Sequence, residues 1–371
     1  MSKKRLKIGV IFGGKSFEHE VSLISAKSII KALDKNKYKI IPIGITKKGK
    51  WLFGRNARAL LEGKRIQSRG VEKCKMQNAK CKIDVFFPIL HGPYGEDGRI
   101  QGCFEMMDKP YVGAAVLASA IGMDKAVQKI IFRAVGLPVG EFIYFTLSKK
   151  DCEILRRLQK GGLHEKRGRG DAKSILPLSE IEKEIKYPCF VKPVNSGSSV
   201  GISKATKRKE LIKAVKIASK FDRKIVVEKA IKNAREIEIS ILGNEDPIAS
   251  LPGEIIPSGE FYDYKAKYID EGSQLIAPAK LGKSLIKKLQ ELAITAYKII
   301  GCAGMARLDF LLERPGLKIY LNEINTIPGF TPISMYPKLW EVSGLPYPKL
   351  LDKLINLAIE RHKTRKFRTE I

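Results

Sequence analysis

Apolar and polar positions alternate along the first third of the chain in blocks that predict strands and helices in turn. Short apolar runs predict strands at 7–12, 38–45 and 85–90, and helical spacing of apolar residues predicts helices at 21–33, 116–121 and 124–135. This alternation is typical of an open parallel α/β sheet, in which ligands bind beyond the carboxyl ends of the strands. Glu18 follows the first strand and His91 follows the third, so we expect both to face one crevice.

The pattern continues through the rest of the chain. It predicts strands at 187–194, 225–230, 235–242 and twice within 305–332, and helices at 207–221, 283–301 and 348–361. At 371 residues the chain exceeds the roughly 250 to 300 residues that one hydrophobic core supports. A Gly-Leu-Pro sequence ends the helix before residue 138. We therefore predict three domains, at 1–138, 139–232 and 233–371.

The segment 305–332 predicts a β-hairpin with a Pro-Gly turn. Because side chains alternate faces along a strand, Arg307 and Asp309 share one face of the first strand, and Glu323 and Asn325 share one face of the second. If the loop centres on the glycine of the turn, Asp309 lies opposite Glu323. Arg307 then lies opposite Asn325.

Two opposed carboxylates repel each other, and a sheet tolerates them poorly unless positive charge lies between them. A divalent cation is the simplest source of that charge. Asp309, Glu323 and the Asn325 amide offer only oxygen ligands, which suit a hard ion such as Mg²⁺. The alternative is an ordinary hairpin with two solvated acids.

Lys192 lies on the predicted strand 187–194, directly before a loop of small residues at 195–201. Backbone N–H groups and hydroxyls in such a loop can surround phosphate oxygens. The segment is not a Walker A loop, because the lysine precedes the loop and no Gly-Lys-Ser/Thr opens a helix. An ordinary glycine-serine turn remains the alternative.

Two other segments carry polar residues in patterns that need explaining. Glu236, Glu238 and Ser240 alternate with isoleucines, so at least some of these acids are expected on a solvent-facing side. The irregular stretch 252–278 contains FYDYKAKY, from Phe261 to Tyr268, and a long loop inside a regular domain is usually functional or disordered. Its four aromatic residues argue against disorder.

Composition removes several classes of protein. No apolar run approaches the roughly 20 residues of a membrane span, and the six scattered cysteines form no metal-binding pattern, which predicts reduced thiols in a soluble cytoplasmic protein. No nucleophile set of the Ser/His/Asp or Cys/His kind is visible. The net charge of +30 makes a basic nucleic-acid-binding protein the non-enzyme alternative. The basic residues are spread evenly, however, without interleaved aromatic residues, so no specific nucleic-acid site is expected.

Taken together, a lysine with a small-residue loop, strand-end acids and an Asp…Glu-x-Asn hairpin resemble the ATP-grasp superfamily. Six motifs extend the resemblance, in order, to the D-alanine–D-alanine ligase family: GGKSFEHEVSLISA, LHGPYGEDG, GMDK, FVKPVNSGSSVG, FYDYKAKY and RLDF…LNEINTIPGFTP. The resemblance implies an N-terminal open parallel-sheet domain followed by a two-part ATP-grasp fold. It also implies ATP-dependent ligation of two D-alanine molecules through a D-alanyl phosphate, for peptidoglycan precursors.

The same resemblance assigns residues to the nucleotide and its metal ions. Phosphate-binding lysines would be Lys125, Lys192 and Lys267, and the adenine and ribose side would be bound by Glu228, Lys229 and Glu236. Two Mg²⁺ ions, with Mn²⁺ as a substitute, would be held by Asp309, Glu323 and Asn325, with Glu323 bridging them.

On the substrate side, the resemblance implies that Glu18 holds the ammonium group of the first D-alanine, with Ser198 and Tyr268 fixing Glu18. His91 would lie near the first subsite. Arg307 and the Gly329 amide would stabilise the oxyanion, and Ser334 would contact the carboxylate of the second substrate.

The resemblance also predicts partners and leaves some questions open. The expected partners are D-alanine and ATP, without membrane attachment, and the family is commonly homodimeric. The loop FYDYKAKY favours D-alanine over D-lactate as second substrate, while ligases that make D-alanyl-D-lactate or D-alanyl-D-serine remain the enzymatic alternatives. No single base for the second step is evident.

Overall fold

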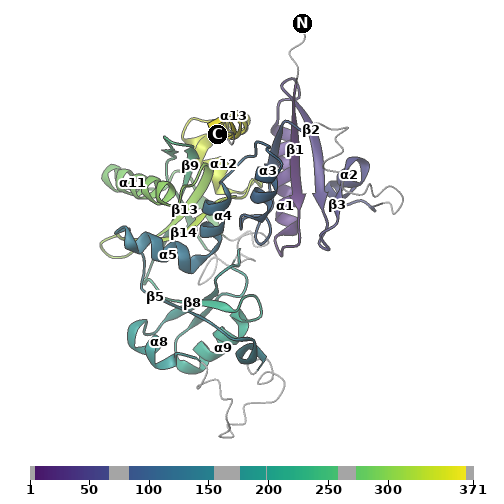
Figure 1. Cartoon of the computed structure of the whole chain (residues 1–371). Coiled ribbons are helices and arrows are strands. Elements are labelled where there is room, and N and C mark those ends of the chain that lie inside the picture. Colours follow the sequence, from purple (N-terminus) through teal and green to yellow (C-terminus); the bar gives the residue numbers. More distant parts are fainter. Residues whose placement is uncertain (1–4, 67–82, 154–175, 198, 258–272, 365–371) are drawn as a thin grey trace, which may run out of the picture.

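The computed structural model describes residues 5–66, 83–153, 176–197, 199–257 and 273–364, and its described strands form three sheets (Figure 1). In the first, β1 (Leu6–Gly13) lies between β2 (Tyr38–Ile45) and β4 (Val85–Pro88), and all three run parallel. The edge strand β3 (Trp51–Leu52) runs antiparallel to β2. The predicted parallel sheet is confirmed, with an antiparallel edge strand too short for its pattern to predict.

Helices cover both faces of this first sheet. Ile8, Val10 and Phe12 alternate along β1 and pack in one core with residues of α1 (His19–Ala32), α2 (Gly54–Glu62) and α13 (Tyr347–Thr364). On the other face, Ile11 and Ile43 pack in a core that includes α3 (Arg99–Met106). Because α13 contributes Leu350 and Leu354 to the first core, the end of the described chain completes the N-terminal unit.

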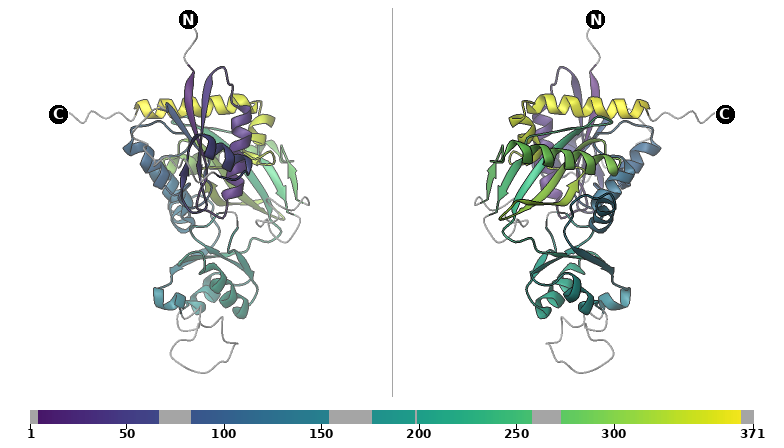
Figure 2. Two further views of the ribbon diagram at one scale, coloured as in Figure 1. Left: turned by 90° about the vertical axis from the view of Figure 1, so that its right-hand side faces the viewer. Right: turned by 90° about the vertical axis from the view of Figure 1, so that its left-hand side faces the viewer.

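The second sheet is antiparallel, in the order β5-β8-β6-β7. Its strands are β5 (Phe142–Thr146), β8 (Lys224–Lys229), β6 (Cys189–Pro193) and β7 (Ser203–Ala205). Its helices α8 (Leu178–Glu184) and α9 (Arg208–Ala218) share one buried core with the strands. Figure 2 shows this unit, in teal, at one end of the molecule.

The third sheet has the order β12-β11-β9-β13-β14, with β10 beside β9. Its strands are β9 (Arg235–Gly243), β10 (Ile248–Ala249), β11 (Gly253–Ile256), β12 (Gln274–Ile276), β13 (Gly304–Glu313) and β14 (Lys318–Asn325). One core combines its apolar side chains with α4 (Val116–Met123), α5 (Lys125–Ala134) and α11 (Lys283–Ile299), while α12 (Met335–Val342) contacts β9. Since α4 and α5 contact β14, packing crosses residue 138, and the three-domain division stays a prediction.

The alternation along β9 and β13 gives this sheet one apolar and one polar face. Ile237 and Phe310 belong to the apolar core, whereas Glu238, Arg307 and Asp309 line a cavity. At least some acids of β9 were expected on a solvent-facing side; Glu236 is half-buried and Glu238 is only 5% exposed. The polar face is covered because other parts of the chain close over it.

The predicted hairpin is formed by β13 and β14. Arg307 pairs with Asn325 and Asp309 with Glu323, so the predicted register is confirmed. The strand pair nearest the turn is Glu313 with Lys318. The midpoint of this pair lies half a residue before Gly316. A bulge between Asp309 and Phe310 inserts Asn322 on the partner strand and restores the opposition of the two carboxylates.

Within the described residues, no helix has both the length and the apolar character needed to cross a membrane. The described cysteines Cys103, Cys152, Cys189 and Cys302 are free thiols, and three of them are buried. The prediction of reduced, mostly buried thiols is therefore confirmed for these four.

Candidate active site

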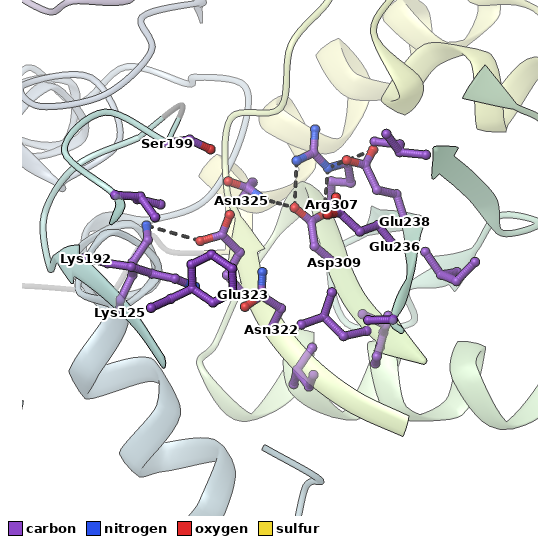
Figure 3. Close-up of a pocket in the computed structure, with 18 of the residues that line it drawn as sticks. Lys125, Lys192, Ser199, Glu236, Glu238, Arg307, Asp309, Asn322, Glu323 and Asn325 are labelled. Carbon is purple, nitrogen blue, oxygen red and sulfur yellow. Dashed lines mark hydrogen bonds and ion pairs between the residues drawn. The ribbon is translucent and has the colours of Figure 1, made fainter. Parts of the chain in front are cut away.

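A cavity of about 640 Å³ lies where the three sheets meet, in the size range of small-molecule sites. The first unit contributes Glu18 and His91, the second contributes Lys192 and Glu228, and the third contributes the hairpin face. Figure 3 shows Lys125 and Lys192 on one side and the hairpin residues Glu323 and Asn325 on the other, coming from separate elements. The described candidate residues that line the cavity are Glu18, His91, Lys125, Lys192, Glu228, Lys229, Glu236, Arg307, Asp309, Glu323, Asn325, Gly329 and Ser334.

Arg307 is held by two carboxylates on this face. Its Nε and Nη2 donate to Asp309 Oδ1 and Oδ2 over 2.7 and 2.8 Å, and its Nε lies 3.1 Å from Glu238 Oε2 (Figure 3). Burial alone would lower the pKa of Arg307, but Asp309 and Glu238 outweigh burial and raise it well above its ordinary value. Arg307 is therefore a fixed cation at the cavity floor.

The hairpin carboxylates form a row across three strands. Asp309 pairs in register with Glu238 on one side and Glu323 on the other, and Asn325 Nδ2 donates to Asp309 Oδ2 over 3.1 Å. Among the contacts of these carboxylates, Arg307 lies against Asp309 and Glu238, and Lys125 lies against Glu323. Among the described residues no set of three acidic, histidine or cysteine side chains converges as a preformed metal cage. Oxygen-only donors nevertheless fit Mg²⁺.

Lysines gather at the opposite wall of the cavity. Asp124 caps the N-terminus of α5 by accepting from the Ala126 and Val127 amides over 3.1 and 2.9 Å, which sets Lys125 in the first turn. Lys125 Nζ lies 3.1 Å from Glu323 Oε2 and donates to Ser196 O over 3.0 Å. Burial would lower the pKa of Lys125, but Glu323 and nearby acids raise it.

Glu228 is the centre of a second charged group. Its Oε2 lies 2.9 Å from Lys192 Nζ and 3.4 Å from Lys129 Nζ. Burial would raise the pKa of Glu228, but the two ammonium groups lower it, and burial lowers the pKa of Lys129. Within the described part of the chain, Glu228 Oε1 is buried without a hydrogen-bond partner, which leaves an acceptor for a ligand.

Lys129 was not among the residues singled out from the sequence. It is 3% exposed, lines the cavity, and donates to Asn322 O over 2.9 Å. It stands one helical turn after Lys125, so the i, i+4 spacing on α5 was a usable signal.

The first unit presents Glu18 at the start of α1. Glu18 is 7% exposed, and its carboxylate meets the loop after Lys192, where a Cβ on Gly197 would come within 2.5 Å of Glu18 Oε2. The small side chains of that loop therefore allow close approach between the first and second units. Phe17, beside Glu18, also contacts Phe221 in the second unit, with ring centroids 5.7 Å apart in an edge-to-face arrangement.

His91 is neutral in this environment. Burial lowers its pKa to about 4, although the carbonyl of Ile327 opposes that shift. Nδ1 lies 3.2 Å from Ile327 O, so Nδ1 carries the proton and Nε2 accepts from the Ser25 hydroxyl, 3.4 Å away. Ser25 Oγ also accepts from the Phe330 amide over 3.2 Å, which ties His91 to the segment after the hairpin.

Glu96 is a further cavity residue to which sequence reasoning gave no role. Its Oε2 accepts from the Gly92 amide over 2.6 Å. Burial, followed by the charge of Glu18, raises the pKa of Glu96 to about 8. The LHGPYGEDG motif therefore supplies a second acid beside Glu18.

Gly329 and Ser334 lie close together after the hairpin. A Cβ on Gly329 would come 2.6 Å from Ser334 Oγ, so only glycine fits here without displacing the hydroxyl. Ser334 Oγ accepts from the Thr331 amide over 2.9 Å and lies 2.7 Å from Thr331 Oγ1. Thr331 was not predicted, and its hydroxyl orients Ser334.

Of the remaining candidates, Glu236 and Lys229 both line the cavity, and the Lys229 ammonium donates to both oxygens of Glu141, each at 2.9 Å. Ser198, Lys267 and Tyr268 lie outside the described residues.

Comparison with known proteins connects this site to a family. Residues 7–114 match the model described as D-ala D-ala ligase N-terminus, and residues 164–356 match the model described as D-ala D-ala ligase C-terminus. A D-alanine–D-alanine ligase from Chloroherpeton thalassium is 49% identical over 99% of this chain and 100% of its own length. This chain belongs to the D-alanine–D-alanine ligase family.

Solved structures of similar proteins agree with this assignment. The D-alanine–D-alanine ligase of Bacillus anthracis, solved in complex with ATP, has a TM-score of 0.71 and 30% identity over 98% of this chain and all of its own. The VanG D-Ala:D-Ser ligase of Enterococcus faecalis has a TM-score of 0.77 and 34% identity over 96% of this chain and all of its own. The ATP-grasp architecture expected for a D-alanine–D-alanine ligase family member is confirmed.

Proposed function

We propose that this chain ligates two D-alanine molecules to D-alanyl-D-alanine with ATP, for peptidoglycan precursors. The observation that carries the proposal is one cavity that combines the lysines, Arg307 and the in-register carboxylates, in a chain related over its whole length to D-alanine–D-alanine ligases. A carboxylate oxygen of the first D-alanine attacks the γ-phosphorus, and ADP leaves. The amine of the second D-alanine then attacks the acyl carbon, phosphate leaves, and the amine loses a proton.

The nucleotide would lie between the second and third sheets. Lys125 and Lys192, with Lys267 of the loop, would bind the phosphates, and the open acceptor on Glu228 suits the adenine side, with Lys229 and Glu236 nearby. Asp309, Glu323 and Asn325 would hold two Mg²⁺ ions, or Mn²⁺, which neutralise phosphate charge when bound. The Gly197 segment would cover the phosphates with backbone donors.

The substrates would lie between the first and third units. Glu18 would bind the ammonium of the first D-alanine, supported by Ser198 and Tyr268, and neutral His91 would lie beside it. Arg307 and the Gly329 amide would stabilise negative charge on the acyl oxygen, and Ser334 would bind the second carboxylate. A tightly held, permanently charged arginine suits this role because it needs no reorganisation during the reaction.

The alternatives have less support. Relatives named D-alanine–D-alanine ligase are 45 to 50% identical to this chain, whereas the D-Ala:D-Ser ligase is 34% identical. A nucleic-acid-binding role would rest on the +30 charge alone. A homodimer, a cytoplasmic location and the absence of specific nucleic-acid or membrane partners stay predictions.

The proposal is tested by measuring phosphate release from ATP with D-alanine, D-serine or D-lactate added, and identifying the product by mass. When D-alanine is the sole substrate added besides ATP, we expect phosphate release and formation of D-alanyl-D-alanine. Preferential D-alanyl-D-serine or D-alanyl-D-lactate synthesis would favour the enzymatic alternatives. RNA retained at high salt, without phosphate release, would favour the nucleic-acid alternative.

A further inference from the structure

Glu238 is a buried acid on β9 to which sequence reasoning gave no function. It pairs in register with Asp309 on β13 and lines the cavity. Its side chain is 6% exposed, and its Oε2 lies 3.1 Å from Arg307 Nε (Figure 3). Asp309 therefore holds the guanidinium through two hydrogen bonds, and Glu238 on the adjacent strand adds an ion pair to the same group.

The way Arg307 is held determines which of its donors remain available. Nε and Nη2 both donate to Asp309, and Nε also lies in ion-pair contact with Glu238. Within the described residues Nη1 makes no hydrogen bond, so its two N–H groups are left for an anion in the cavity. Asp309 also accepts from Asn325, so it divides its oxygens between two donors, and Glu238 adds a second point of attachment.

A second buried pair in the same sheet shows what a purely structural ion pair looks like. Arg235 donates to Glu254 through Nε and Nη2 over 2.7 and 2.6 Å, and Glu254 is 8% exposed. Glu254 pairs in register with Ile237 on β9, and neither Arg235 nor Glu254 lines the cavity. The Arg235–Glu254 pair has the same charges and similar side-chain burial as the Arg307–Glu238 pair, but it is joined by two hydrogen bonds and lies away from the cavity.

We propose that Glu238 is a positioning residue that fixes the Arg307 guanidinium so that Nη1 points at the reacting centre. The inference rests on the proposed role of Arg307 in the ligase reaction. Glu238 acts through Arg307 and touches neither substrate. Its removal leaves Asp309 as the remaining anchor of the guanidinium and lowers turnover, because a less rigidly held donor stabilises developing charge less well.

The kinetic test compares Glu238→Gln with Glu254→Gln, alone and in an Arg307→Lys background. Loss of a positioning contact lowers kcat about 10- to 100-fold in Glu238→Gln, with KM for ATP within about threefold of wild type. Glu254→Gln keeps kcat within about threefold. In the Arg307→Lys background, adding Glu238→Gln changes kcat by no more than about twofold. Equal losses in both backgrounds would overturn the inference.

A second readout does not depend on activity. The ¹⁵Nε–¹H signal of Arg307, assigned by its absence in Arg307→Lys, reports how tightly the guanidinium is held. We expect its proton to exchange at least about tenfold faster in Glu238→Gln and to be unchanged in Glu254→Gln. Exchange within about twofold of wild type would overturn the inference even if the enzyme ligates D-alanine. A wild-type protein inactive with D-alanine would refute the proposed function, and the exchange measurement would still decide the role of Glu238.

If Glu238→Gln unfolds, Glu238→Asp serves in its place. It keeps the charge and removes one methylene, so we expect a smaller loss of kcat and intermediate exchange at Arg307. The proposed role depends on the distance between Glu238 and Arg307. It would be contradicted if Glu238→Asp kept wild-type kcat and wild-type proton exchange at Arg307 while Arg307→Lys lost its activity fully.

Discussion

Asp309 on β13 lies directly opposite Glu323 on β14, and each carboxylate is held by a different cation. Arg307 binds Asp309 from the same strand over 2.7 Å, while Lys125 reaches Glu323 from α5 over 3.1 Å. The repulsion expected between facing acids is therefore divided between two cations from different parts of the chain. Glu238 lies in the same row, so three carboxylates are aligned across three strands, and their oxygens are donors that suit divalent ions.

Replacing Glu323 tests the metal assignment. Glu323→Gln keeps the size of the side chain but removes the charge proposed to bridge the metal ions, so we expect kcat to fall at least about 100-fold and the Mg²⁺ requirement to rise. Steady-state phosphate release across a Mg²⁺ titration measures both. Glu313→Gln, farther along β13, is the matched control and should keep normal turnover. Near-normal activity of Glu323→Gln at saturating Mg²⁺ would refute the assignment.

Replacing Lys129 tests whether the cavity lysines bind the nucleotide. Because its ammonium lies beside Glu228 and Lys192, we expect Lys129→Met to raise KM for ATP about tenfold and to leave KM for D-alanine within about twofold. Lys213→Met, on the exposed side of α9, should change neither constant. Thermal unfolding of both variants checks that the fold survives. An unchanged KM for ATP would exclude Lys129 from the nucleotide site.

Glu96 predicts a pH dependence of stability. Its pKa is about 8 in the folded protein against an ordinary 4.5, so the folded state keeps a proton that the unfolded state releases between these values. The stability that the Glu96 proton provides is complete below pH 4.5 and is lost as pH rises through 8. Glu96→Gln cannot titrate, so its free energy of unfolding should exceed that of wild type by an amount that grows from pH 5 to pH 8, to about 2 to 4 kcal/mol.

Denaturant titrations at several pH values measure this difference, with Glu360→Gln on the exposed side of α13 as control. A constant difference between Glu96→Gln and wild type would show that Glu96 is ionised in the folded protein at neutral pH. A similar pH trend in Glu360→Gln would show that the effect is not specific to the cavity.

The Phe17–Phe221 contact joins the first and second units beside Glu18. We expect Phe17→Ala and Phe221→Ala each to lower kcat/KM several-fold, because closure around the substrates is weakened. The double variant should lose less than the product of the single effects, with a coupling of about 0.5 to 1.5 kcal/mol. Ile248→Ala, another exposed apolar position, should have no effect. Strictly multiplicative losses would mean that the two rings act separately.

Sequence reasoning was most successful where pairing is local. The register of Arg307 with Asn325 follows from strand alternation and a short turn, and it was predicted even though the bulge at Asn322 was not. The turn is centred half a residue before Gly316, and the bulge compensates for this displacement. Residue propensities for strands and turns do not specify such a detail.

The unpredicted residues depend on contacts between distant segments. Glu238 enters the site only because β9 pairs with β13, about 70 residues later in the chain, and the pattern of β9 alone suggests a solvent-facing acid. Lys129 and Glu96 likewise become cavity residues only when the units assemble. Motif resemblance supplied Glu18 and Ser334, and no local pattern could predict that both line one cavity.

The central claim is that ATP phosphorylates the carboxylate of the first D-alanine. D-alanine labelled with ¹⁸O in its carboxylate, incubated with ATP and Mg²⁺, tests it by mass spectrometry of the released phosphate and the dipeptide. We predict one ¹⁸O atom in each phosphate for every D-alanyl-D-alanine formed. Dipeptide formed with unlabelled phosphate, or with the label in AMP, would contradict the account.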